Sequence, residues 1–211
     1  MDFVKISEGL TLAQTVAEAG KRKLRLPSNL ELDERLVKSD AWKSEKSMYP
    51  CRTGTLVVYE AWGKPFKSKL QWEGFTVLIP KKFQGKKNLA LVCNHPDFQP
   101  KGTTFSSNKF TAMALPGEDG WYDPEPRFGL PMGERKDYAD SRRYLWRYQD
   151  DAFIGLVVRG YLVFLGDYRR DVVALRGPSR LYGVFGVAGK NKAVKHIHEW
   201  KCECGATKSV R

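Results

Sequence analysis

The sequence predicts an α+β protein: a mainly antiparallel β-sheet with two short N-terminal helices and a long irregular, aromatic-rich insertion. Three observations support this fold class. Apolar residues have helical spacing in the first fifty residues, and short β-branched and aromatic runs dominate from residue 54 onward. The connections between most of these runs are too short to contain crossover helices.

With 211 residues, of which 42% are hydrophobic, the chain can bury a substantial core. We therefore expect a single domain that spans residues 1–211. Its expected parts are a helical N-terminal part (1–50), a β-rich core (51–95 and 141–200), an irregular insertion (96–140) and a tail (201–211).

Two helices are expected in the N-terminal part. Thr11 can cap a helix that extends to about Ala19, and Gly20 is a stop signal. The apolar face of this helix consists of Leu12, Val16 and Ala19. A second helix begins at Ser28–Glu31, which has the form of a capping box, in which the serine oxygen accepts a backbone N–H and the glutamate reaches back to the cap. Its partial apolar face consists of Leu30, Leu36 and Val37.

The β-rich core is predicted from β-branched and aromatic runs that are bounded by Gly, Pro or charged residues. Because the connections are short, antiparallel pairing is expected. Gly85 suits the loop of a hairpin over Pro80–Lys87, between the second and third strands. The predicted strands are Thr55–Tyr59, Phe75–Ile79, Leu89–Cys93, Phe153–Leu165, Val172–Leu175, Leu181–Val187 and Ala193–Trp200.

The insertion, residues 96–140, is rich in proline, glycine and acidic residues and shows no firm helix or strand pattern. Its aromatic side chains would be costly to leave in water, so we expect an ordered loop packed over the sheet, not a disordered linker. These aromatic residues are Phe98, Phe105, Phe110, Trp121, Tyr122 and Phe128.

The formal net charge is +12, and residues 1–105 contribute +7 and residues 106–211 contribute +5. Because the excess is spread along the chain, we expect positive potential on the folded surface, which favours polyanions such as nucleic acid or an anionic membrane. Lysine dominates the first half and arginine the second. Since the planar guanidinium suits phosphate, an anion site is expected first in the C-terminal half.

The strongest nucleic-acid pattern is Arg142–Tyr148, which reads RRYLWRY. If extended, this segment has its three aromatic residues on one face and Arg143, Leu145 and Arg147 on the other. Such a row beside arginines is typical of a stacking platform for single-stranded nucleic acid. The alternative is that the aromatic face packs in the core. With arginines from nearby turns, the predicted site consists of Arg143, Tyr144, Trp146, Arg147, Tyr148, Arg169, Arg170, Arg176 and Arg180.

The segment His196–Gly205, HIHEWKCECG, holds the densest set of potential metal ligands. In a hairpin centred on Trp200, each histidine would lie across from a cysteine, which gives a tetrahedral zinc donor set. The predicted ligands are His196, His198, Cys202 and Cys204, with Cys93 and His95 as a conceivable second half of a zinc ribbon. The alternative is a basic tail with unligated cysteines, because Cys-x-Cys is not the usual zinc spacing.

Catalytic motifs are weak. The segment Gly183–Asn191 departs from a phosphate-binding loop, because Val184 stands where glycine is required and Asn191 replaces the magnesium-binding hydroxyl. Asn94–Asp97 offers a histidine and a carboxylate after a strand, but neither a nucleophile nor a second partner accompanies them. A hydrolytic or metal-dependent enzyme is therefore a lesser hypothesis.

These features predict a non-catalytic nucleic-acid-binding accessory protein that uses a basic, arginine-rich surface. The second hypothesis is a structural or assembly subunit whose basic surface faces an acidic protein partner or lines a nucleic-acid particle. A homo-oligomer is an alternative to the acidic protein partner. The N-terminus lacks a signal-peptide pattern, and the longest apolar run, Phe153–Leu165, contains Arg159 and is too short to span a membrane. We therefore expect an intracellular, cytoplasmic protein with reduced or metal-bound cysteines and no transmembrane segment.

Overall fold

The computed structural model describes residues 3–7, 10–38, 51–137, 143–147, 151–164, 167–174, 183–188, 200–201 and 207–208. Its helices are α1 (Leu12–Lys21), α2 (Asn29–Lys38) and the short 3-10 helix η2 (Lys81–Phe83). Its strands are β1 (Phe3–Ser7), β2 (Leu24–Arg25), β3 (Cys51–Tyr59), β4 (Lys69–Trp72), β5 (Phe75–Leu78), β6 (Leu89–Asn94), β7 (Gln99–Lys101), β8 (Thr104–Ser106), β9 (Thr111–Ala114), β10 (Gly120–Tyr122), β11 (Arg143–Trp146), β12 (Phe153–Phe164), β13 (Asp167–Ala174), β14 (Gly183–Ala188), β15 (Trp200–Lys201) and β16 (Thr207–Lys208).

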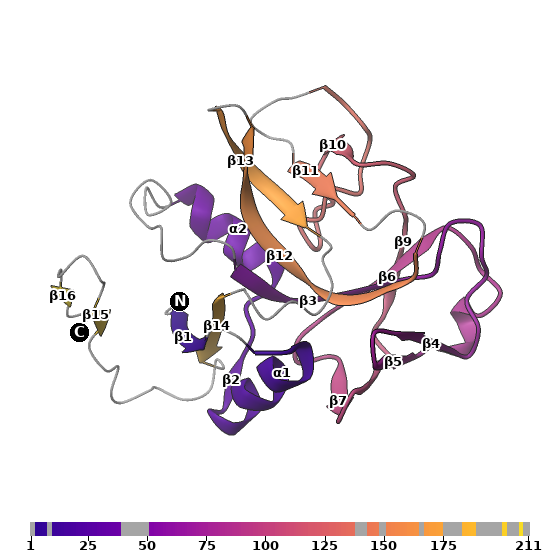
Figure 1. The fold of residues 1–211 in the computed structure, drawn as a ribbon, viewed down its shortest axis with the longest axis horizontal. Helices are drawn as coiled ribbons and strands as arrows, with labels where there is room; N and C mark the ends of the chain where they lie inside the picture. The colour runs from indigo at the N-terminus through magenta and orange to yellow at the C-terminus, as the bar shows by residue number, and fades with distance from the viewer. Residues whose placement is uncertain are drawn as a thin grey trace.

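These strands form three sheets, with mainly antiparallel pairing (Figure 1). The predicted fold class is therefore confirmed. Among the described strands, parallel pairing occurs between β5 and β8, β11 and β13, and β3 and β14.

Helix α1 has the predicted cap and apolar face. The Thr11 hydroxyl accepts the backbone N–H of Gln14, and the Gln14 side chain accepts that of Thr11, which completes a capping box. The three predicted apolar positions are at most 3% exposed. The helix continues through Gly20 to Lys21, because a single glycine near a helix end lowers helix stability without terminating it.

Helix α2 also begins with the predicted capping box. The Ser28 hydroxyl accepts the Glu31 N–H at 3.2 Å, and the Glu31 carboxylate accepts the Ser28 N–H at 2.8 Å. The same carboxylate pairs with Arg25 at 2.5 Å. Asn29 then donates its backbone N–H to Thr55 at 2.8 Å. The start of α2 is thereby fixed against β3.

Of the central strands β3, β6 and β12, all of β3, most of β6 and residues 153–158 of β12 are buried on both faces. All nine residues of β3 are buried, and β3 pairs antiparallel with both β6 and β12. Its side chains alternate between two hydrophobic clusters, with Leu56 and Val58 in the first and Val57 and Tyr59 in the second. A strand that is covered on both faces has a continuous apolar run, which is why its sequence predicts a strand so clearly.

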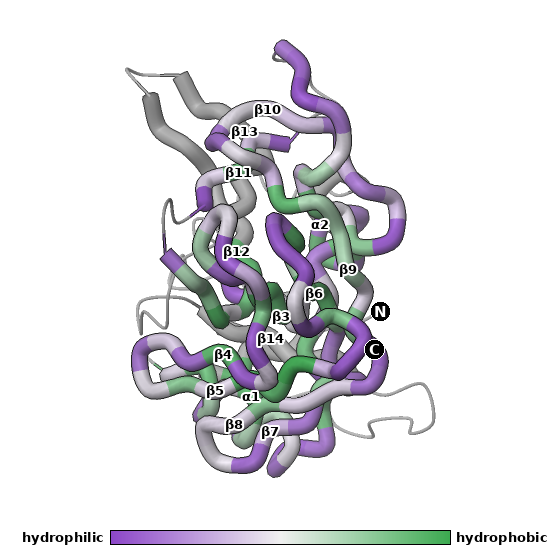
Figure 2. Tube along the Cα trace, turned by 90° about the vertical axis from the view of Figure 1, so that its right-hand side faces the viewer, coloured by the Kyte–Doolittle hydropathy of each residue, from purple (hydrophilic) through white to green (hydrophobic). Residues whose placement is uncertain are grey.

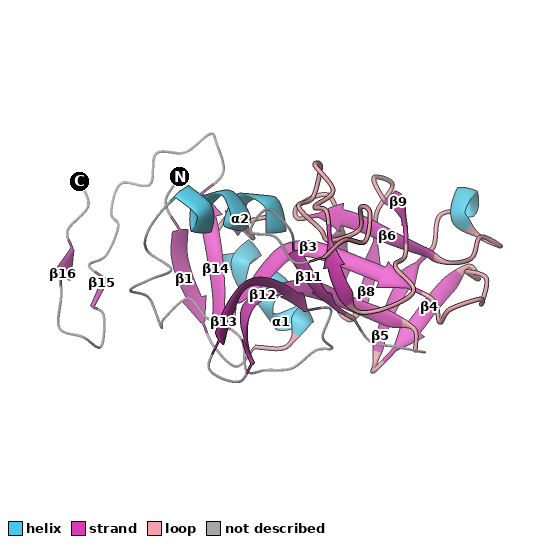
Figure 3. Ribbon diagram, turned by 90° about the horizontal axis from the view of Figure 1, so that it is seen from above, coloured by secondary structure: helices cyan, strands magenta, loops and turns pink. Residues whose placement is uncertain are grey.

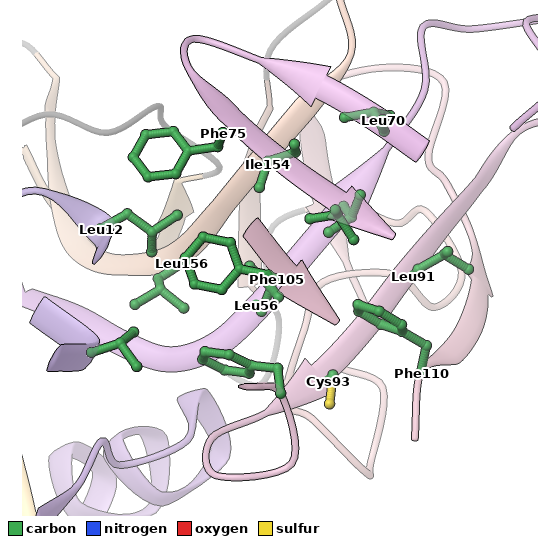
Figure 4. Close-up of a cluster of buried hydrophobic side chains, with 14 of the residues drawn as sticks. Leu12, Leu56, Leu70, Phe75, Leu91, Cys93, Phe105, Phe110, Ile154 and Leu156 are labelled. Atoms are coloured by element: carbon green, nitrogen blue, oxygen red, sulfur yellow. The ribbon is translucent and has the colours of Figure 1, made fainter. Parts of the chain in front are cut away.

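One face of the central strands is covered by α1 and by a four-stranded sheet with the order β4-β5-β8-β7. The inward side chains of this small sheet, such as Leu70, Phe75 and Phe105, pack on Leu56 and Leu156 in the first cluster (Figure 4). Figure 3 shows the small sheet and the short helix η2 at the end of the molecule away from β1 and β14. The inward face of the small sheet thus belongs to the core, which leaves its outward face to solvent.

The insertion covers both faces of the central strands. Its first part supplies β7 and β8 to the small sheet, and residues 113–132 contribute Met113, Leu115, Phe128 and Leu130 to the second cluster. All six aromatic residues named for it are buried, so its predicted packing is confirmed. The insertion also contains four short strands, β7 to β10, that were not predicted, because runs of three or four residues between prolines and glycines are too short to show a period.

The predicted hairpin over Pro80–Lys87 is wrong. Strand β5 pairs with β4 and β8, whereas β6 pairs with β3 and β9, so this segment connects two sheets. The true hairpin joins β4 to β5 through Glu73 and Gly74, whose φ angles of 45° and 80° suit a two-residue turn. The predicted strand Ala193–Trp200 lies outside the described residues except at Trp200.

Candidate nucleic-acid interface

Strand β11 is extended, and its arginine face is the buried one. Arg143, Leu145 and Arg147 are 6%, 0% and 6% exposed, whereas Trp146 is 39% exposed. The alternative that the aromatic face packs in the core is therefore wrong for Trp146. Because Arg143 and Arg147 are turned inward, they are not available to phosphates at the surface, contrary to their predicted role.

Both buried arginines bind other parts of the chain. Arg143 donates from Nε and Nη2 to the two carboxylate oxygens of Asp33, each at 3.1 Å, and so links β11 to α2. Arg147 donates from its side chain to the carbonyl of Gly117 and from its backbone to Asp119 at 3.0 Å. The planar guanidinium that suits phosphate also suits these internal acceptors.

Of the aromatic row, Tyr144 is half-buried and meets Trp121 edge-on at 5.2 Å between ring centroids. Trp146 is exposed, and Tyr148 lies outside the described residues. Arg169 and Arg170 lie in strand β13 and not in the predicted turn, and only their backbone is described. Arg176 and Arg180 lie outside the described part of the chain. The described side chains alone therefore do not form the predicted platform.

The four predicted zinc ligands, His196, His198, Cys202 and Cys204, lie outside the described residues. Strand β15 pairs with β16, in which Trp200 lies opposite Lys208 and Lys201 opposite Thr207. Within the described ranges, no cluster of three or more His, Cys, Asp or Glu side chains could hold a metal. Zinc binding remains a prediction from ligand chemistry.

The alternative catalytic residues at the end of β6 have other partners. His95 accepts the backbone N–H of Leu26 at Nδ1, 3.0 Å away, and Asp97 pairs with Lys109 at 2.6 Å. Burial, assisted by the charge of Arg25, lowers the pKa of His95 to about 4. An imidazole of such low basicity, already occupied as an acceptor, is a poor general base at neutral pH.

The thiol beside this histidine is not activated. Cys93 is buried with its Sγ 3.2 Å from the Ser107 hydroxyl, and burial raises its pKa. The adjacent groove of about 450 Å³ is lined by Asp97 and Ser107 but not by His95. Because the thiolate is the nucleophilic form, this arrangement favours a structural role for the cysteine.

The largest concentration of positive charge lies in two segments before residue 110, whereas an anion site was expected first in the C-terminal half. We call residues 61–88 and 97–109 the lysine lobe; it contains the small sheet, η2 and their loops. The lobe has nine lysines and two acidic residues, a net charge of +7 of the +12 of the whole chain. All nine lysines are exposed, and Figure 2 shows hydrophilic stretches along these loops.

Most lysines of the lobe are not neutralised by a neighbouring carboxylate. Lys109 pairs with Asp97, and Glu73 lies at the tip of the β4–β5 hairpin. The remaining lysines form no ion pair with any residue that the structure describes. These eight are Lys64, Lys67, Lys69, Lys81, Lys82, Lys86, Lys87 and Lys101.

The outward face of the small sheet is polar and carries lysine on both edge strands. Lys69 on β4 lies opposite Leu78, and Lys101 on β7 lies opposite Thr104. Gln99 and Ser106 form a second opposed pair on the same face. This face therefore combines cationic groups with hydroxyl and amide groups that form hydrogen bonds.

The positive charge of this lobe can be read from the sequence, but a comparison of the two halves of the chain conceals it. Residues 1–60 have a net charge of +1, whereas residues 61–110 have +7, so a shorter window separates them. Because the planar guanidinium of arginine suits phosphate, an anion site was also expected in the arginine-rich C-terminal half. Trp62 lies outside the arginine-rich half and was therefore not predicted as a site residue. Its place between strand β3 and Gly63-Lys64-Pro65 is the signal that could have identified it.

Comparison of the chain with protein-family models, with curated proteins and with solved structures finds no match. None of the helices in the described residues has the length and apolar character needed to cross a membrane.

Proposed function

We propose that the lysine lobe binds nucleic acid through its phosphates, without catalysis and with little sequence specificity. The observation that carries this proposal is the gathering of eight exposed lysines, none ion-paired within the described chain, at one end of the molecule. Each such ammonium group can replace a counterion at a phosphate, and the release of these counterions drives binding.

Two features favour nucleic acid over an anionic membrane. Stable binding to a membrane surface usually combines buried apolar area with electrostatic attraction to anionic lipids. Among the described side chains of the lobe, the exposed large apolar residues are Trp62 and Leu78. The remainder of the outward sheet face is polar, which suits contacts with phosphate and sugar.

Lysine contacts fix a nucleic acid in place without reading its sequence, since specificity requires directed contacts with base edges. We therefore propose an accessory role, in which the protein coats or holds a strand. Arg169, Arg170, Arg176 and Arg180 remain proposed secondary contacts, on the chemistry of arginine alone.

The first test is reversal of charge within the lobe. In Lys81→Glu/Lys87→Glu, we expect affinity for a labelled oligonucleotide of about 20 nucleotides to fall at least tenfold, measured by fluorescence anisotropy between about 50 and 200 mM salt. The slope of log affinity against log salt should become shallower by about two, since two phosphate contacts are lost.

The matched control is Lys21→Glu/Lys23→Glu, which makes the same charge change at exposed positions at the end of α1. This control should keep its affinity within about threefold, because only the long-range field changes. Equal losses in both variants would show a response to net charge alone. Absence of binding by the wild-type protein at low salt would refute the proposed function.

A further inference from the structure

Trp62 is held in a tight turn after β3 with its side chain 48% exposed. The Lys64 N–H donates to the Ala61 carbonyl at 2.9 Å, and Gly63 has a φ of 78°, as the third residue of a type II turn requires. Gly63 also donates its N–H to the side chain of Asn88 at 2.7 Å. The turn is therefore tied to the loop that precedes β6.

The six-membered ring of the indole lies beside Gly117. A Cβ atom built on Gly117 would lie 3.7 Å from Cη2 and 3.9 Å from Cζ2 of Trp62, which is ordinary van der Waals contact. About half of the side chain remains in water. Burial of a large aromatic surface is strongly favourable, so a ring held in this position is suited to covering by a ligand.

Exposed lysines lie in the turn that holds this ring and in the loop bound to that turn. Lys64 lies in the same turn, and Lys86 and Lys87 directly precede Asn88 in the loop bound to it. The carbonyl of Lys86 accepts the N–H of Phe66 at 2.9 Å, which holds the two loops together.

The two acidic residues nearest in sequence to the indole and its support both have partners. Glu60 accepts the N–H of Ala61 at 3.1 Å, and Glu118 pairs with Arg135 at 2.5 Å. Arg135 neutralises Glu118, whereas Glu60 keeps its charge, so the three lysines outnumber the one uncompensated carboxylate among these neighbours.

From these contacts we infer that Trp62 is a base-stacking residue and that the lysine lobe prefers single-stranded to duplex nucleic acid. An exposed aromatic ring beside lysines can stack on one base while the adjacent phosphates meet the ammonium groups. In a duplex, the base faces are already stacked on each other and cannot cover the indole. This inference rests on the proposed function and names its substrate class.

Trp146 is also exposed, at 39%, but its surroundings differ. Arg143 in β11 and Arg147 directly after it are buried, so these two arginines do not supply cationic groups at the surface. Trp62, in contrast, lies in a turn with an exposed lysine, among the residues that the structure describes.

The test compares an oligothymidylate of about 20 nucleotides with a duplex of the same length, at one fixed salt concentration. Trp62→Ala should lower single-strand affinity about tenfold and leave duplex affinity within about twofold, because only stacking is lost. Trp62→Phe, which retains a ring, should keep most of the single-strand affinity. Leu78→Ala is the matched control, since Leu78 is equally exposed at 48% in the same lobe but cannot stack.

The outcomes separate the two proposals. If the wild type binds both probes and Trp62→Ala leaves single-strand affinity unchanged, the stacking inference is overturned and the lysine proposal stands. An equal loss for both probes would also overturn it, because stacking must distinguish them. If neither probe binds at low salt, the proposed function itself fails. Thermal melting of each variant checks that the fold is retained.

Discussion

At the scale of single residues, the surroundings of a side chain decide its chemistry. Arg143 belongs to a pattern typical of phosphate binding, yet its guanidinium pairs with Asp33, 110 positions away in the sequence. Removing one partner of such a buried pair leaves an uncompensated charge, which usually costs about 3–5 kcal/mol. The local sequence shows that a guanidinium is present, but it cannot show which acceptor will meet it.

His95 allows a quantitative prediction at this scale. Its pKa is about 4 in the folded chain and 6.5 in the reference state, so the unfolded chain binds a proton that the folded chain excludes as pH falls through this range. The free energy of unfolding should therefore be highest above pH 6.5 and fall as the pH approaches 4. At about 1.4 kcal/mol for each pKa unit, the loss is at most about 3.5 kcal/mol.

Urea unfolding of the wild type and of His95→Asn, measured across this pH range, checks the prediction. Asparagine retains an acceptor for the Leu26 N–H but does not titrate there. The difference in unfolding free energy between the two proteins should therefore change with pH. The contributions of the carboxylates cancel in this difference, because both proteins contain them. A constant difference would contradict the assignment.

At the scale of elements, the junction between β2, α2 and β3 depends on a close approach of two backbones. Gly54 donates its N–H to the Pro27 carbonyl at 2.5 Å. A Cβ atom at position 54 would lie 2.6 Å from both the Cβ and the carbonyl oxygen of Leu26. Because one of these atoms belongs to the backbone, the neighbouring segment cannot move aside cheaply.

Gly54→Ala should therefore destabilise the protein by about 2–3 kcal/mol, as overpacked substitutions do. Chemical denaturation measures this change directly. Gly20→Ala is a suitable control, because a Cβ atom at position 20 meets nothing within 4 Å and lies in α1. The control should be neutral or slightly stabilising. A Gly54 variant as stable as the wild type would show that the β2–α2 junction can shift.

The elements differ in how well their sequences predict them. Both helices and the central strands follow from local signals, since a capping box and a continuous apolar run are complete within one segment. Strands such as β7 and β10 have three residues each and exist because neighbouring strands satisfy their backbone groups. The choice of partner for β5 depended likewise on tertiary packing, because residue spacing alone favoured the wrong hairpin.

At the scale of the whole molecule, the unneutralised lysines of the lobe should reduce stability in the absence of a polyanion. Charges of one sign repel, and this repulsion is screened over about 10 Å at 0.1 M salt. Lys81→Glu/Lys87→Glu should therefore melt about 2–4 °C above the wild type at low salt, which corresponds to about 1 kcal/mol for a chain of this size.

Differential scanning calorimetry at low and high salt measures this effect. The difference between the two proteins should shrink as salt rises, and saturating single-stranded nucleic acid should raise the melting temperature of the wild type more. A variant that melts below the wild type at low salt would show that these lysines stabilise the lobe instead of repelling one another.

The sequence by itself determined the fold class, both helices with their caps, the central strands and the basic character of the surface. These features depend on residues close together in the chain or on composition. Only the tertiary structure decided which basic residues face solvent. Arg143 in β11 and Arg147 directly after it turn inward because Asp33 and Gly117 accept their hydrogen bonds, whereas the lysines of the small sheet and its loops remain exposed. Burial and pairing are properties of distant segments brought together, and for that reason the candidate site moved from the arginine-rich half to the lysine lobe.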